Sequence, residues 1–146
     1  MAVRVKLKIR TRKGEVGRES ISSGLVNSGF ESDVPEIILP LALASNLGLY
    51  PKLPAGTSIE KYEVAGGGRL DSYSVKDGVE VQVLTDDKVS NPVVTTCIIM
   101  AGEKEVLIGD KLISKFAIVI EDAGEGIWHF RGESNRRKSE PPQYWG

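Results

Sequence analysis

Short stretches of alternating apolar and polar residues, separated by glycine-rich turns, most constrain the fold of this chain. The clearest of them is residues 2–10. In this stretch the apolar residues Val3, Val5, Leu7 and Ile9 alternate with basic residues. A period of two places these four side chains on the inner face of a half-buried strand. Of the 146 residues, 16 are glycine, more than the usual share of about 7%. This excess favours turns and therefore a β-rich fold.

The same reasoning predicts most of the remaining elements. We expect a continuously apolar strand at 93–100, buried on both faces, and a short strand at 106–109 that ends at glycine. Two short helices are expected, one over 41–47 ending at Gly48 and one over 111–114 with Asp110 as its N-cap. Further strands are expected at 20–26, 57–64, 69–75, 78–84, 116–121 and 126–130. Many short strands with two short helices indicate one all-β domain, a small closed barrel or sandwich.

Composition excludes several classes of function. The net charge is −1 and the pI is about 5.9, so nothing points to a polyanion partner. A single cysteine, Cys97, and a single histidine, His129, argue against a disulfide, a zinc site and a Cys–His nucleophile. The longest apolar stretch, 37–43, is short and contains Pro40, so no membrane span and a cytoplasmic location are expected. We expect no cofactor and no metal.

One turn carries the strongest functional signal. The apolar residues Leu25 and Val26 lead into Asn27-Ser28-Gly29. Pro40 and an Ala-x-x-Leu-Gly-Leu stretch at 44–49 follow, then Ala65-Gly66-Gly67-Gly68 at the tip of an expected hairpin, and later Val106-Leu107-Ile108-Gly109 before a helix. In this order and spacing the four features resemble the retropepsin-like (retroviral-type) aspartic peptidases. In that family an Asp-Thr-Gly or Asp-Ser-Gly turn is followed by a glycine-rich flap and an Ile-Gly element.

The resemblance implies a retropepsin-like barrel over residues 1–131, with 132–146 as a polar C-terminal tail. It also implies a homodimer, because each chain of such a peptidase supplies one catalytic aspartate. The catalytic turn would be Asn27, Ser28 and Gly29. Positions that contact a substrate would be Glu31, Ser32 and Asp33 after the turn, and the flap glycines Gly66, Gly67 and Gly68.

Asn27 stands where the family carries its catalytic aspartate. Two facing aspartates share one proton, and this provides one acid and one base. A carboxamide does not titrate in the useful range and cannot take a proton from water. The sequence therefore favours a peptide- or protein-binding module without ordinary aspartic peptidase activity. Two alternatives stay open. The first is an aspartic-type hydrolase that uses the neighbouring acids Glu31, Asp33 or Glu36. The second is a peptidase in which Asn27 replaces a native aspartate or is converted to aspartate by deamidation.

Other interpretations of these segments have weaker support. The acids after the turn do not follow an EF-hand pattern and most resemble a solvated loop. The glycine-rich segment 65–68 lacks the Lys-Ser/Thr of a phosphate-binding loop. A nucleic-acid-binding barrel would use Arg4, Lys6, Lys8 and Arg10, but alternating basic residues more commonly form the wet face of a sheet. The run Arg136-Arg137-Lys138 is expected to be solvated, and Trp145 to be exposed or bound to a partner.

Overall fold

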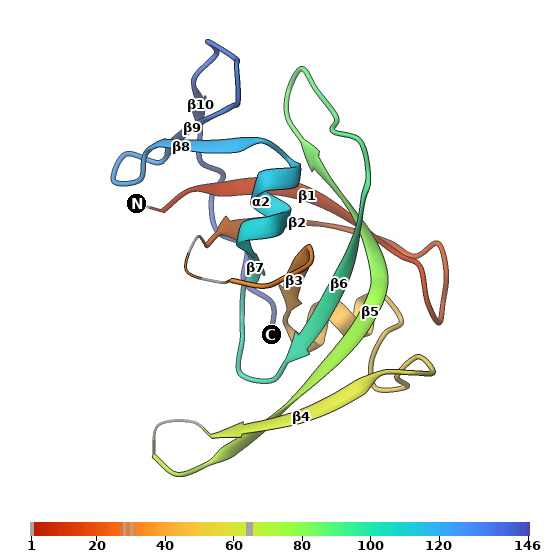
Figure 1. Ribbon diagram of the computed structural model, residues 1–146. Helices are drawn as coiled ribbons and strands as arrows, with labels where there is room; N and C mark the ends of the chain where they lie inside the picture. Colours follow the sequence, from red (N-terminus) through yellow and green to blue (C-terminus); the bar gives the residue numbers. More distant parts are fainter. Residues whose placement is uncertain (1, 28, 30, 64–65) are drawn as a thin grey trace.

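The alternating N-terminal segment forms the strand that closes a barrel. In this computed structural model, which describes residues 2–27, 29, 31–63 and 66–146, strand β1 (Arg4–Thr11) pairs antiparallel with β2 (Glu19–Val26) on one side. On its other side β1 pairs antiparallel with β5 (Arg69–Leu84). These two pairings close a six-stranded barrel in the order β1-β2-β7-β3-β6-β5 (Figure 1). The all-β closed barrel expected from the sequence is therefore confirmed.

The other elements follow the predicted order along the chain. They are β3 (Glu36–Leu39), α1 (Leu41–Asn46), β4 (Ser58–Glu63), β6 (Val93–Met100), β7 (Val106–Ile108), α2 (Asp110–Lys115), β8 (Ile118–Asp122), β9 (Ile127–Phe130) and β10 (Arg137–Lys138). Strands β8, β9 and β10 form a separate three-stranded sheet. No helix in the described part of the chain is long and apolar enough to cross a membrane.

Two parallel pairings join distant segments in the middle of the strand order of the barrel. Strand β7 lies between β2 and β3, parallel to β2 and antiparallel to β3. Strand β3 in turn pairs parallel with β6. Parallel neighbours cannot be joined by a tight hairpin. The ends of β2 and β7 therefore meet at the same edge, although about 80 residues separate them in sequence.

The inner face of the barrel is the hydrophobic core. Val5, Leu7 and Ile9 are fully buried, as their alternation predicts, and Val3 is 2% exposed. In β6 the buried residues are the alternate ones Thr95, Cys97 and Ile99, together with Thr96. The expectation that β6 is buried on both faces is wrong, because Val94 is 42% exposed. A closed barrel has one interior, so the outward-facing Val94 stays in contact with solvent.

Cys97 is buried at 0% exposure, as predicted, and this burial raises the pKa of its thiol to about 12. Because the thiolate is the reactive form, we expect the native protein to resist alkylation by iodoacetamide at neutral pH. Unfolding in guanidinium should make the thiol react at once. Mass spectrometry before and after denaturation checks this, and rapid labelling of the native chain would contradict the buried position.

Strands β4 and β5 form a hairpin that extends from one end of the barrel, away from the small sheet (Figure 1). The two strands expected at 69–75 and 78–84 are one 16-residue strand, β5. A register shift between Val75 and Val79 marks the place where it bends. A bulge of this kind lets one strand serve both the arm and the barrel. Gly78 lies at this bend, where a Cβ would come within 2.9 Å of the Cys97 sulfur.

The C-terminal residues pack against the rest of the chain. Arg137 belongs to β10, and its side chain is only 10% exposed, so the expectation of a solvated basic run is wrong for this residue. The Trp145 ring packs against the core and its Nε1 donates a hydrogen bond to Ser22 Oγ at 2.9 Å. The backbone N–H of Glu140 donates to the carbonyl of Arg4. The expected division at residue 131 remains a prediction.

Candidate functional site

Asn27 is held at the end of β2 by the strand beside it. The Asn27 backbone N–H donates to the carbonyl of Ile108 at 3.2 Å, just beyond the parallel register of Val26 with Ile108. Gly109, the next residue of that segment, donates its N–H to the carbonyl of Glu36 at 3.2 Å. Asn27 is therefore fixed where β2, β7 and the first residue of β3 converge.

The Asn27 side chain closes a small turn of its own. Its Oδ1 accepts a hydrogen bond from the Gly29 N–H at 3.0 Å. The asparagine is half-buried and Gly29 is exposed. Ser28, the middle residue of the expected catalytic turn, lies outside the described residues. A carboxylate at position 27 would accept the same N–H, and a bond to the charged form would favour its ionisation.

The residues expected after the turn line a polar hollow of about 600 Å³. Glu31, Ser32 and Asp33 form one wall. The first and last turns of α2 form the other, through residues that the sequence analysis did not assign to a site: Asp110, Lys111 and Ser114. The signal that could have found them is the pairing of β7 with β2, which brings the segment after Gly109 beside the turn. Sequence spacing alone does not reveal that pairing.

Asp110 does not cap α2. The N-cap residue is Gly109, in an extended conformation and without a side-chain hydrogen bond, and Asp110 is the first residue of the helix. The expectation that Asp110 caps this helix is therefore wrong. An acid in the first turn still interacts favourably with the positive end of a helix. Its side chain also lines the polar hollow.

Among the neighbouring acids, Glu36 has a perturbed acidity. Burial raises the pKa of its carboxyl above the ordinary value. A hydrogen bond with Ser32 opposes that rise, and the negative charges of Asp33 and Glu60 add to it. Glu36 is half-buried in the first position of β3, whereas Glu31 and Asp33 are exposed. Of the three acids that could support different chemistry, Glu36 therefore has the environment closest to that of a general acid.

The glycine-rich tip of the hairpin lies apart from this hollow. Gly66, Gly67 and Gly68 are exposed, and none of them lines the hollow beside α2. Gly66 and Gly67 have φ values of 97° and 85°, a region that L-residues with a side chain rarely adopt. Figure 1 shows the β4–β5 hairpin extending away from α2 and from the small sheet. The structure thus confirms the hairpin and places its glycines outside the hollow beside α2.

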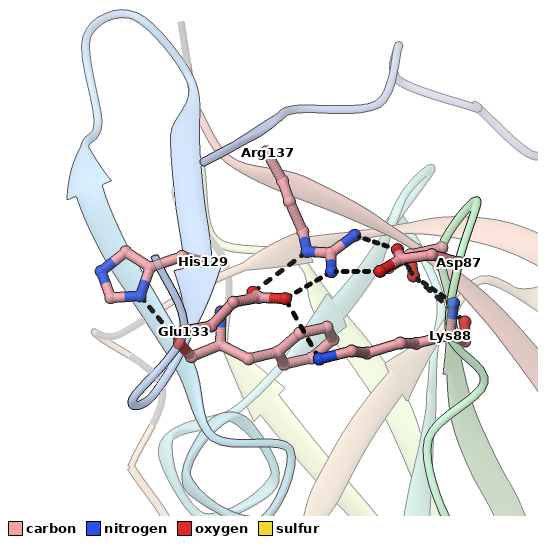
Figure 2. A network of polar contacts seen from close by, with 7 residues as sticks. Asp87, Lys88, His129, Glu133 and Arg137 are labelled. Atoms are coloured by element: carbon pink, nitrogen blue, oxygen red, sulfur yellow. Dashed lines mark hydrogen bonds and ion pairs between the residues drawn. The ribbon is translucent and has the colours of Figure 1, made fainter. Parts of the chain in front are cut away.

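Metal-site and triad chemistry find no support in the described residues. Within that part of the chain, no group of three His, Cys, Asp or Glu side chains could hold a metal ion. His129 lies in β9, where its Nδ1 is 2.8 Å from the carbonyl oxygen of Phe130. Figure 2 shows this ring beside the ion-pair cluster of the small sheet.

Comparison with known proteins supports the fold. No protein-family model matches the chain, and no curated protein matches it in sequence. Among solved structures, it is similar to the retroviral protease-like domain of Ddi1 from Leishmania major, with a TM-score of 0.52 and 12% sequence identity. That match covers 97% of this chain and 97% of the other. A retropepsin-like fold is therefore confirmed, at an identity that shows the fold alone.

Proposed function

We propose that this protein is a cytoplasmic, homodimeric peptide- or protein-binding module built on a retropepsin-like fold, without ordinary aspartic peptidase activity. The observation that carries the proposal is Asn27 at the end of β2, anchored by Ile108 and bonded to Gly29. The likeness of Asn27-Ser28-Gly29 to the Asp-Ser-Gly turn of retropepsin-like peptidases supports taking position 27 as that of the catalytic aspartate. An amide there can hold a water molecule by hydrogen bonds but cannot remove its proton.

The hairpin supports a role in binding extended chains. Strand β4 is the last strand in the order of the barrel sheet, and no strand of the described residues other than β5 pairs with it. An exposed edge of this kind can accept an extended peptide as an additional strand, through main-chain hydrogen bonds. Ile59 on β4 is 58% exposed and offers an apolar contact beside that edge.

A binding measurement tests the proposal directly. We expect the unmodified protein to bind fluorescently labelled peptides from a casein digest in an anisotropy titration, while mass spectrometry finds those peptides uncut. Ile59→Asp should weaken binding by roughly tenfold, because it places a charge beside the edge of β4. Ile120→Asp is the matched control, since Ile120 is also exposed (36%) but lies in the small sheet.

Two outcomes would count against a binding module. The first is an unmodified protein with no affinity for the peptides, or equal losses in the two isoleucine variants. The second is cleavage of the peptides by the unmodified protein. That result would favour the alternative, an aspartic-type hydrolase that acts through neighbouring acids, and Asp33→Asn, Glu31→Gln and Glu36→Gln would then identify the acid. The raised pKa of Glu36 makes it the first of the three to test.

A further inference from the structure

The peptide bond after Asn27 differs from the bonds after the other asparagines. Asn27 precedes serine, whereas Asn46 precedes leucine, Asn91 precedes proline and Asn135 precedes arginine. An asparagine side chain can cyclise when the next peptide nitrogen attacks its Cγ. A small following residue hinders that attack least, and a following proline has no N–H to give up. Asn46, Asn91 and Asn135 are all exposed, so they serve as internal controls for this chemistry.

The structure adds a feature that the sequence alone does not show. When a nitrogen attacks Cγ, negative charge develops on Oδ1 of the asparagine. The Gly29 N–H already donates to that oxygen at 3.0 Å. A preorganised donor at this distance stabilises an oxyanion as it forms. The Gly29 N–H is therefore placed to stabilise the charge that attack on the Asn27 side chain creates.

From these observations we infer that Asn27 is a site of spontaneous deamidation. The peptide nitrogen of residue 28 loses its proton and bonds to Cγ, and the amide nitrogen leaves with protons as ammonia. A five-membered succinimide results, and water opens it at either carbonyl to give aspartate or isoaspartate. The net reaction consumes one water and releases one ammonia, and no oxidant or reductant is needed. Position 27 acquires a titratable carboxyl in this way.

The effect of this deamidation on activity rests on the proposed function. If position 27 corresponds to the catalytic position of the fold, the aspartyl product carries the missing acid, whereas the isoaspartyl product carries an extra backbone atom. A slowly growing fraction of dimers would then contain one or two aspartates. The modification itself does not depend on this role and is measured separately.

The test follows the modification in water labelled with oxygen-18. Purified full-length protein is incubated at mildly alkaline pH and digested, and heavy-oxygen uptake is measured for each peptide that contains an asparagine. We expect uptake at residue 27 at least about tenfold faster than at Asn135. We also expect the folded chain to react at least as fast as the same chain in urea, where the Gly29 hydrogen bond is lost. Ser28→Ile should slow the reaction in both states by hindering the nitrogen.

Slower uptake at residue 27 in the folded chain than in urea would overturn the inference, because the fold would then protect the asparagine. Uptake no faster than at Asn135 would overturn it as well. Failure of the proposed function has a different signature: freshly prepared protein, in which the peptide mass shows that residue 27 is still asparagine, would cleave peptides. The two failures are therefore distinguishable in one preparation.

Discussion

Asn27→Asp is expected to convert the protein into an acid-dependent peptidase. The Gly29 N–H that now bonds Asn27 Oδ1 would orient the new carboxylate. In a dimer two such carboxylates would share one proton and supply both an acid and a base. Restored general-base catalysis should raise the cleavage rate of denatured casein at least about 10²–10⁴-fold over the parent. Activity should fall above about pH 6, where both carboxyls ionise.

The controls separate chemistry from folding. Asn27→Ala should remain inactive and lower Tm by only about 2–4 °C, because it removes a single hydrogen bond, from the exposed Gly29 N–H. The specific activity of Asn27→Asp should rise with protein concentration if each chain supplies one carboxylate, and pepstatin should inhibit it. A folded, dimeric Asn27→Asp variant without activity would show that position 27 does not correspond to the catalytic position.

Arg137→Ala is expected to cause a large loss of stability. The Arg137 guanidinium lies between two carboxylates, with Nη1 2.7 Å from Asp87 Oδ1 and Nη2 2.6 Å from Glu133 Oε1 (Figure 2). The guanidinium carbon, Cζ, lies 5.1 Å from the centre of the Phe130 ring. The side chains of Arg137 and Glu133 are 10% and 12% exposed. Removing the cation leaves the largely buried Glu133 carboxylate with only Lys88 Nζ, at 3.2 Å, and the Phe130 N–H as partners. We therefore expect Tm to fall by about 5–10 °C in calorimetry.

The adjacent arginine is a matched control. Arg136 also pairs with an acid, Glu121, at 2.6 Å, but its side chain is 64% exposed. An exposed ion pair contributes little, so Arg136→Ala should lower Tm by less than about 2 °C. Equal effects of the two variants would mean that the Arg137 cluster does not hold the small sheet to the loop between β5 and β6.

The same cluster predicts a pH dependence with a defined sign. Hydrogen bonds from Arg137 lower the pKa of Asp87 and of Glu133 to about 2. In the unfolded chain both groups have ordinary values of about 4. A lowered native pKa stabilises the fold above the unfolded value, and this contribution is lost as the pH falls toward 2. The Tm difference between the parent and Arg137→Ala should therefore be constant near neutral pH and shrink below about pH 5.

Much of the candidate site was predictable because its parts are local. The turn at Asn27–Gly29 follows an apolar strand, the hairpin tip is marked by three glycines, and Gly109 ends a short apolar run. Each of these signals depends on residues within a few positions of one another. The contribution of α2 to the polar hollow was not predictable in this way. Asp110, Lys111 and Ser114 reach the hollow only because β7 pairs with β2.

The sequence by itself determined most of the strands, the buried alternation of Val3 to Ile9, the burial of Cys97 and the amide at position 27. Each of these follows from local periodicity or from the chemistry of one side chain. Only the tertiary structure decided which distant segments pair. It joined Arg137 to Asp87 across 50 residues, and Trp145 to Ser22 across 123. A local pattern of apolar and charged residues gives a strand its inner face but not its neighbour, which depends on how the whole barrel closes.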